Sequence, residues 1–303
     1  MIKRTLYFGN PAYLKTKNEQ LLIDLTETGE FKTAVIEDIG IMVLDNQQIT
    51  ITQSVISKLL ANNVALIVCD DIHHPTGLML NLDGHTLQSQ RFQHQINASV
   101  PLKKQLWQQV VTAKITNQAN LLELYRISNK RLRSLSKMVK SGDSDNCEAQ
   151  AATYYWKHVF PLFPGFRRFR EGDPPNNLLN YGYAILRAIV ARNLVGSGLL
   201  PTLGIFHRNQ YNAYCLADDI MEPYRPFVDQ IVYDIIRGNG NYLDLTPKMK
   251  QQLLAIPVVD VNIEGDKSPL MNAVQRTTAS LAKCFEGKSK KLLFPVLATS
   301  FSK

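Results

Sequence analysis

The spacing of apolar residues changes once along the chain, near Asp83-Gly84, and this change constrains the fold more than any other feature. Before it, short apolar runs are separated by turn residues, which is typical of β-strands. After it, apolar residues recur every three or four positions, as in the stretch 102–110, which is typical of amphipathic helices. We therefore predict an α+β fold, with a small β-rich domain over residues 1–84 and a larger, all-helical domain over residues 85–303.

Five strands and one helix are expected in the first domain. Thr52 is a favourable N-cap residue for a helix whose apolar residues share one face. These residues are Val55, Ile56, Leu59 and Leu60. The strands are predicted at 4–8, 20–25, 33–36, 41–44 and 64–69.

Helices are expected to dominate the second domain, beginning with the stretch near residue 102. Prolines between residues 160 and 177 make a continuous helix implausible there. The other helices are predicted at 146–158, 178–195, 211–222 and 227–236.

The chain is basic, with 34 Lys and Arg against 26 Asp and Glu and a formal net charge of +8. A basic surface favours a polyanionic partner such as nucleic acid, because neutralised phosphates release their counterions. A basic protein without such a partner is the alternative. At 303 residues and 45% hydrophobic, the chain can bury a sizeable core, so disorder is not expected.

The cysteines and the N-terminus favour a reducing, cytoplasmic environment. The cysteines are widely spaced and form no CxxC pair, so neither a zinc site nor a redox motif is indicated. The N-terminus has no apolar core of signal-peptide length, and no stretch reaches the roughly 18 apolar residues needed to cross a membrane. We expect buried thiols at Cys69, Cys147, Cys215 and Cys284.

Three segments place polar residues in apolar surroundings, where an unpaired carboxylate or imidazole costs free energy. In the first, Glu148 lies near the start of a predicted helix, one turn before the small residues Ala151 and Ala152. Small residues let another helix approach closely, which leaves room for a site. The alternative is a glutamate that favours the first helical turn through the helix dipole.

The other two segments add a histidine and an acidic group. His207 follows an apolar stretch, and its imidazole could bind a metal, relay a proton or be a satisfied structural residue. Asp218 and Asp219 precede Glu222 closely enough that at least one carboxylate neighbours it on a helix. A cation, either Arg225 or a divalent metal, would stabilise such a cluster. The alternative is a solvated acidic turn.

Together these segments resemble one family closely: the CRISPR-associated integrase of spacer acquisition, the adaptation protein numbered one in that nomenclature. The resemblance rests on the Glu148 segment and on NNLLNYGYAILRA, GLLPTLGIFHRNQYNAY and LADDIMEPYRPFVD, in the family's order and at its usual distances. A short β-rich domain before a longer helical one is also the family's architecture. The opening KRTLYFGNPAYLKTKNEQLLI is similar to the branch associated with type II, single-effector systems.

The resemblance implies that Glu148, His207 and Glu222 are the catalytic residues and the metal ligands. Asp219 would be a secondary acid, and Arg225 would contact phosphate or hold the carboxylate in place. A ligand set of nitrogen and oxygen atoms suits Mg²⁺ or Mn²⁺.

The implied activity is DNA integration, in which the 3'-hydroxyl of a short DNA fragment attacks a phosphodiester of the repeat array. The chain contains no GxxxxGK[ST] phosphate loop, in keeping with a reaction that needs no ATP. The implied partners are double-stranded DNA fragments, repeat-array DNA, a second copy of the chain and a small companion adaptation protein, and whether the RNA-guided effector nuclease joins them is left open. The N-terminal domain would serve dimerisation and partner contact.

Two alternatives to integration stay open. The first is a metal-dependent endonuclease that acts on branched or single-stranded DNA by hydrolysis, through the same residues. The second is a non-catalytic DNA-binding scaffold whose acidic cluster is structural.

Two basic stretches outside these motifs are candidates for DNA contact. The first is predicted to be helical, with a basic face that could follow a DNA backbone or simply be solvated. The face consists of Lys130, Arg133, Lys137 and Lys140, with Arg131 outside it. The second stretch could contact phosphate and stack on a frayed DNA end, or pack as a loop. It consists of Phe166, Arg167, Arg168, Phe169 and Arg170.

Overall fold

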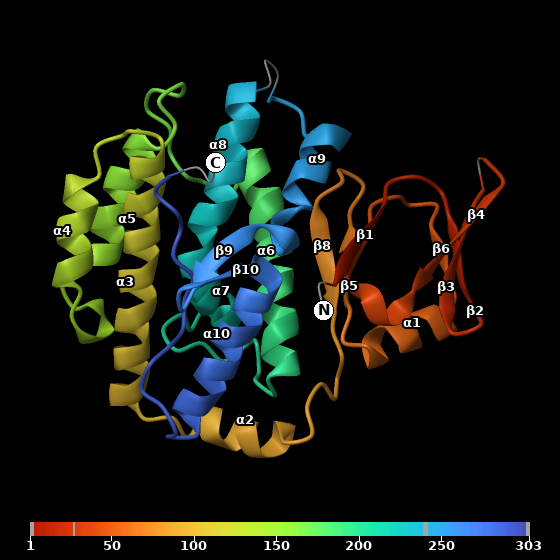
Figure 1. Cartoon of the computed structure of the whole chain (residues 1–303), viewed down its shortest axis with the longest axis horizontal. Coiled ribbons are helices and arrows are strands. Elements are labelled where there is room, and N and C mark those ends of the chain that lie inside the picture. Colours follow the sequence, from red (N-terminus) through yellow and green to blue (C-terminus); the bar gives the residue numbers. More distant parts are fainter. Residues whose placement is uncertain (1–2, 27, 239–241, 301–303) are drawn as a thin grey trace. The chain divides into compact units, whose positions relative to one another are not determined.

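The computed structural model describes residues 3–26, 28–238 and 242–300 and divides into two units, residues 1–88 and residues 89–303. In the described part of the first unit, the strands form two four-stranded sheets (Figure 1). β1, β5 and β7 of the first sheet run parallel, and β8 is antiparallel to β7. In the second sheet, β3 pairs antiparallel with β2 and β4, and β6 is parallel to β2. The bounds are β1 Arg4–Phe8, β2 Tyr13–Lys17, β3 Gln20–Leu25, β4 Glu30–Val35, β5 Ile39–Leu44, β6 Thr50–Ile51, β7 Ala65–Cys69 and β8 Pro75–Met79.

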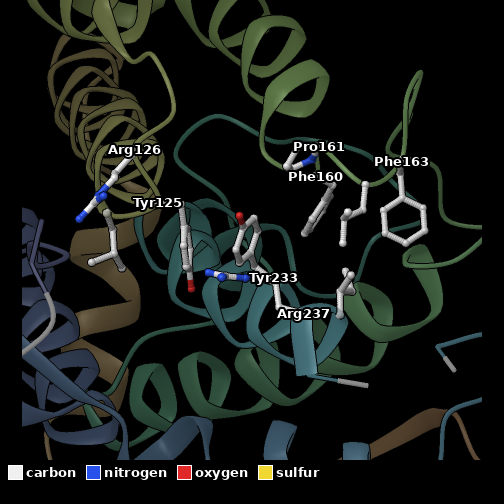
Figure 2. A pocket seen from close by; sticks show the side chains of 10 residues that line it. Tyr125, Arg126, Phe160, Pro161, Phe163, Tyr233 and Arg237 are labelled. Carbon is white, nitrogen blue, oxygen red and sulfur yellow. The ribbon is translucent and has the colours of Figure 1, made fainter. Parts of the chain in front are cut away.

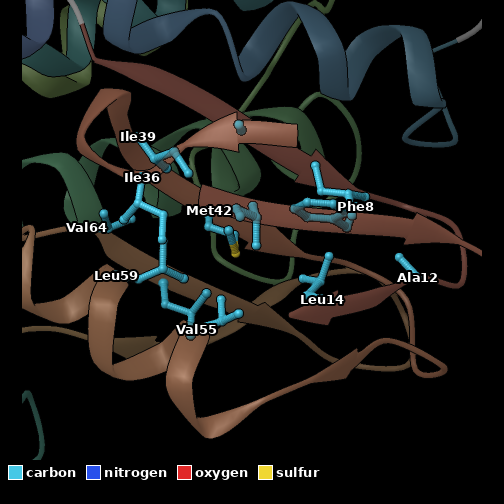
Figure 3. Close-up of a cluster of buried hydrophobic side chains, with 13 residues drawn as sticks. Phe8, Ala12, Leu14, Ile36, Ile39, Met42, Val55, Leu59 and Val64 are labelled. Carbon is cyan, nitrogen blue, oxygen red and sulfur yellow. The ribbon is translucent and has the colours of Figure 1, made fainter. Parts of the chain in front are cut away.

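The hydrophobic core of the first unit joins its strands to α1 (Gln53–Ala61), as Figure 3 shows. Val55 and Leu59 of α1 are fully buried and belong to one cluster with Ile39 and Met42 of β5. Each such side chain contributes about 1.5–3 kcal/mol through the apolar surface that it removes from water. The apolar face predicted for this helix is therefore the one that packs on the sheet.

The predicted strands and the helix after Thr52 are confirmed, with shifts of a few residues at their ends. Thr52 is the N-cap residue, although its side chain makes no capping hydrogen bond. β2, β6 and β8 were not predicted, because their sequences lack the strand pattern. β2 is rich in polar residues, β6 has two residues, and β8 contains Pro75 and Gly77, which are depleted in strands.

The second unit is mostly helical, as predicted, but a β-hairpin interrupts its helices. β9 (Asp260–Ile263) pairs antiparallel with β10 (Asp266–Pro269). Glu264 and Gly265 turn the chain between them, with φ angles of 53° and 90°. Two consecutive residues with positive φ are typical of tight hairpin turns. The expectation of an all-helical domain is therefore wrong in this segment.

α6 (Asn176–Gly196) is the central helix of the second unit (Figure 1). It is buried on almost every side and packs against α7, α8, α9 and α10. Gly182 is required where α8 approaches, because a Cβ there would lie 2.5 Å from Val228 Cγ1. The other helices are α2 Gln88–Ile96, α3 Val100–Leu124, α4 Lys130–Met138, α5 Cys147–His158, α7 Cys215–Met221, α8 Arg225–Gly238, α9 Pro247–Leu253 and α10 Leu270–Phe285.

The helix predicted at 211–222 is shorter in the structure than expected. α7 begins only at Cys215, and a 3-10 turn, Glu222–Tyr224, follows it. The side chains of Asn209 and Asn212 each accept a hydrogen bond from the backbone N–H two residues later, which holds the preceding segment in turns. The other predicted helices are confirmed with small shifts at their ends, and the chain between α5 and α6 contains no α-helix, as predicted.

The cysteines are buried thiols, as expected. Among the residues that the structure describes, every helix is too short or too polar to cross a lipid bilayer.

Candidate active site

Two carboxylates from different helices converge on one lysine in the second unit. Lys114 extends from the middle of α3, and its Nζ lies 2.7 Å from Glu148 Oε1 and 2.6 Å from Glu222 Oε2. Glu148 lies in the first turn of α5, where Asp143 accepts hydrogen bonds from the backbone N–H groups of Cys147 and Glu148. Two of the three predicted ligands therefore meet in space, on a cation that was not predicted.

A second cation holds the other oxygen of Glu222. Arg225 Nε lies 2.8 Å from Glu222 Oε1, and the guanidinium lies over the Tyr183 ring, 4.5 Å from its centroid. Burial by itself would raise the pKa of Glu222, but Arg225 and Lys114 together lower it to about 2. Arg225 therefore holds the carboxylate in place, which is one of the two roles expected for it.

The Tyr183 ring that supports Arg225 is fixed by a buried aspartate. Asp229 accepts a hydrogen bond from Tyr155 at 2.6 Å and another from the Tyr183 hydroxyl. Burial raises the pKa of Asp229 to about 6, against the opposing effect of these two bonds. Both tyrosine hydroxyls therefore have an acceptor inside the protein, and this fixes the ring that lies against Arg225.

His207 is oriented by the fully buried carboxylate of Asp219. The His207 Nδ1 lies 2.5 Å from Asp219 Oδ1, and this hydrogen bond raises the pKa of His207. It leaves Nε2 as the ring nitrogen that can meet a ligand, on a side chain that is 41% exposed. A carboxylate on one ring nitrogen is typical of histidines that bind a metal through the other.

Asp219 also closes the loop that carries the histidine. Its oxygens accept hydrogen bonds from the backbone N–H groups of Ile205, Phe206 and His207 at 2.7, 2.9 and 3.2 Å. Gly204 is required beside it, because a Cβ there would lie 2.4 Å from the His207 carbonyl oxygen and 2.8 Å from Asp219 Oδ2. The expected secondary acid is therefore a positioning residue for His207.

The rest of the acidic segment is also buried and paired. Asp218 Oδ1 lies 2.7 Å from Arg187 Nε, and Asp218 Oδ2 accepts a hydrogen bond from Asn212 at 2.7 Å. Asp218, Asp219 and Glu222 are all buried. The interpretation of this segment as a solvated acidic turn is therefore wrong.

The described residues contain no group of three His, Cys, Asp or Glu side chains placed to hold a metal ion together. The hydrogen bond to Asp219 makes the largest contribution to the raised pKa of His207. The negative charges of Glu222 and Glu148 raise this pKa further. The donors nevertheless suit a divalent ion. Glu222 Oε2 is buried and lacks an aligned hydrogen bond, although Lys114 Nζ lies 2.6 Å away as an ion-pair partner. The metal role of the predicted ligands stays a prediction.

The arginines of the stretch 166–170 have different environments. Arg168 donates hydrogen bonds to Asn176 Oδ1 at 2.9 Å and to Asn180 Oδ1 at 2.7 Å, so it anchors the loop to α6. Arg167 is exposed. Arg168, which was predicted to contact DNA, is engaged inside the protein, and the exposed Arg167 stays a candidate for that contact.

We expect Arg168→Ala to lower the free energy of unfolding by about 1–3 kcal/mol, because hydrogen bonds from a charged donor are lost. Arg167→Ala is the matched control and should leave it nearly unchanged. Urea denaturation of both variants measures the difference. Equal effects at the two positions would contradict the anchoring role of Arg168.

The two phenylalanines of this stretch also differ. The Phe166 ring packs edge-on against Phe160, with ring centroids 5.2 Å apart, as the loop-packing alternative expects. Phe169 is 57% exposed. Of these two phenylalanines, Phe169 therefore stays the candidate for stacking on a DNA base.

The basic face predicted on α4 is only partly available. Arg133 pairs with a glutamate of α3 at 2.6 Å, and Lys140, which lies beyond the helix end, pairs with an aspartate at 2.8 Å. Lys130 and Lys137 are exposed and have no ion pair within the part of the chain that the structure describes. These two lysines are the residues of this face that stay candidates for DNA contact.

A basic cavity of about 320 Å³ adjoins the loop of His207. Lys103 and Lys104 of α3 line it together with Arg208, the residue after the histidine. The stacked rings of Phe206 and Trp107, 4.2 Å apart, contribute to its wall. These cations were not predicted, because a pair of lysines and an arginine far along the chain form no motif.

A larger cavity, of about 520 Å³, contains none of the candidate ligands. Figure 2 shows the rings of Tyr125, Tyr233 and Phe160 along it, with Arg237 beside the tyrosines. The two tyrosine rings stack with centroids 3.7 Å apart. Because α3 carries Lys114 and ends at Leu124, which lines the cavity, and a helix rises 1.5 Å per residue, the cavity lies about 15 Å along α3 from the acidic site.

The fold and the site together define a class of protein. An oriented histidine beside two carboxylates is a candidate catalytic centre, and the basic cavity next to its loop suits a polyanionic substrate. A family model described as "CRISPR associated protein Cas1" matches residues 6–250. The "CRISPR-associated endonuclease Cas1" of Neisseria meningitidis serogroup C (strain 8013) is 37% identical over 295 residues, which cover 97% of this chain and 95% of that protein. The chain therefore belongs to the Cas1 family, as its motifs predicted.

Two solved structures share the fold. One is titled "Casposase bound to integration product" and has a TM-score of 0.77 and 21% identity, covering 96% of this chain and 92% of that one. The other is a "Cas6-RT-Cas1--Cas2 complex", with a TM-score of 0.74 and 18% identity, covering 96% of this chain and 36% of that one. At these identities the likeness concerns the fold alone.

Proposed function

We propose that the chain is a metal-dependent DNA integrase of CRISPR adaptation, which joins the 3'-hydroxyl ends of short foreign DNA fragments to the repeat array. The observation that carries this proposal is the convergence of Glu148 and Glu222 beside an oriented His207, in a member of the Cas1 family. The reaction is a transesterification. The fragment's hydroxyl oxygen forms a new bond to phosphorus as the bond to the target strand's leaving oxygen breaks, and the hydroxyl proton passes to the departing strand or to solvent.

The residues of the site have two roles, metal binding and the positioning of the metal ligands. Glu148, His207 and Glu222 would hold Mg²⁺ or Mn²⁺, which polarises the phosphodiester when bound. Asp219 binds His207 Nδ1 and so leaves Nε2 free to meet the metal. Arg225 holds Oε1 of Glu222. Because Asp219 is buried and Arg225 is ion-paired, the donors they contact are held in place before DNA arrives.

The basic side chains beside the site are suited to DNA backbone. Lys103, Lys104 and Arg208 line one cavity next to His207, where phosphates of a bound fragment would be neutralised. Arg167 and Lys130 are exposed cations elsewhere in the same unit and would extend the contact.

The names of related proteins support both the activity and the partners. The casposase structure was solved with an integration product, which favours strand joining for a chain of the same fold. The complex with Cas2 favours a small companion protein as a partner here. We further propose a second copy of the chain and the RNA-guided effector nuclease as partners, with the first unit in dimerisation and partner contact.

A metal-dependent endonuclease that hydrolyses branched or single-stranded DNA is the second candidate function. The relative from Neisseria meningitidis is named an endonuclease, and water in place of the fragment's hydroxyl would use the same site. The products distinguish the two activities.

Removal of the metal is expected to abolish joining. A labelled fragment with 3'-hydroxyl ends and a plasmid that carries the repeat array should give a joined product with Mg²⁺ or Mn²⁺, and none with EDTA. A 3'-deoxy fragment controls for the nucleophile. Cutting without joining would favour the endonuclease, and products that are indifferent to metal would overturn both functions.

A further inference from the structure

Lys114 lies at the point on which the two candidate ligands converge. Its Nζ is 2.7 Å from an oxygen of Glu148 and 2.6 Å from an oxygen of Glu222, and its side chain is only 12% exposed. Burial disfavours the charged form of Lys114, and its ion pairs with both carboxylates offset that cost. One positive charge thus bridges carboxylates from α5 and from the turn after α7.

The positions of the oxygens leave no room for two cations between them. A divalent ion bound to carboxylate oxygens lies about 2.0–2.6 Å from them. The Lys114 ammonium already lies 2.6 and 2.7 Å from one oxygen of each glutamate. An ion on the same two oxygens would therefore lie where the ammonium is.

We propose that Lys114 competes with the divalent cation for Glu148 and Glu222, and that its ammonium leaves both carboxylates when the ion binds. This inference rests on the proposed metal site and adds a built-in counter-ion to it. Lys114 keeps two neighbouring like charges from repelling each other, and it thereby weakens metal binding. Arg225 is not exchanged, because it holds the other oxygen of Glu222.

The test measures Mn²⁺ binding to the full chain by the loss of the free-ion EPR signal. Lys114→Met removes the competing charge at similar length, and Lys114→Gln removes it while keeping a polar donor. Both variants should bind Mn²⁺ about tenfold or more tightly than the unmodified chain, since contacts with a charged donor no longer have to be broken. Lys114→Arg keeps the charge and should bind no more tightly.

A second readout is the melting temperature in EDTA, with Lys283→Met as the matched control on an exposed helical lysine. Lys114→Met and Lys114→Gln should melt lower than the unmodified chain in EDTA and gain more from Mn²⁺ than it does. The control should match the unmodified chain in both readouts.

The outcomes separate this inference from the proposed function. Glu148→Gln should weaken Mn²⁺ binding if the proposed ligands are correct. If it does so, and both neutral Lys114 variants bind Mn²⁺ no more tightly than the unmodified chain, the competition by Lys114 is overturned and the metal site stands. If Glu148→Gln leaves Mn²⁺ binding unchanged, the ligand assignment fails, and the inference fails with it.

Discussion

Glu148→Gln is expected to reduce joining of a labelled fragment to repeat-bearing DNA by on the order of 10³-fold, at saturating metal and DNA. The substitution keeps the size of the side chain but removes one of two carboxylate charges that meet at a single point. The backbone around it should not change, because Asp143 holds the first turn of α5 through the N–H groups of Cys147 and Glu148, which the variant retains. The initial rate of joined product measures the loss.

The controls for this prediction test charge and folding separately. Glu264→Gln neutralises a glutamate in the turn between β9 and β10 and should retain full joining activity. Far-ultraviolet circular dichroism should show that Glu148→Gln is folded. Joining at more than a tenth of the unmodified rate in a folded Glu148→Gln protein would exclude this carboxylate as a ligand that the reaction needs.

Asp219→Ala is expected to lower the free energy of unfolding by about 3–5 kcal/mol, the largest effect on stability predicted for the site. The carboxylate is fully buried and accepts hydrogen bonds from the backbone of Ile205, Phe206 and His207 and from the imidazole. Its removal leaves these donors without an acceptor. Urea denaturation, followed by fluorescence, measures the change.

Asp145→Ala is the matched control for this prediction. Asp145 is a surface aspartate of the same unit, paired with Lys140, and its removal should leave the midpoint of unfolding nearly unchanged. Because Asp219 also orients His207, Asp219→Ala protein that is still folded at low temperature should join DNA poorly. Full activity of the folded variant would show that His207 does not depend on this carboxylate.

The sequence indicated which residues belong to the site better than it indicated which atoms those residues contact. Glu148, His207 and Glu222 lie in motifs with fixed spacing, so they could be selected together although each was ambiguous alone. What motifs cannot show is which atoms a side chain contacts. Asp219 was therefore assigned to the chemistry, whereas its oxygens are engaged by the loop before α7.

Lys114 was missed for a related reason. It lies near Val110, Val111 and Ile115, and a lysine in apolar surroundings can extend its charged end to solvent, so it gave no sign of a buried ion pair. The carboxylates that make it important come from segments far along the chain. A lysine among apolar residues of a long helix was the only hint in the sequence. Its role as an ion-pair partner follows from the packing of α5 and α7 against α3.

The strands of the first unit could also be predicted only in part. β5 and β7 were predicted because continuous apolar runs suit strands that are buried in a sheet. β8 was not, since it begins with Pro75 and contains Gly77, and its place is set by pairing with β7. Local pattern thus predicts an element only where the residues themselves supply the stabilising contacts.

The close approach of Gly204 to Asp219 and His207 has a consequence for how this chain can vary. Any side chain at position 204 would meet the carbonyl oxygen of His207 and the carboxylate of Asp219. We therefore expect single substitutions at Gly204 and at Asp219 to be costly. In a library of random single substitutions they should be intolerant as a group, while Tyr211, which is 88% exposed a few residues away, should accept almost any residue.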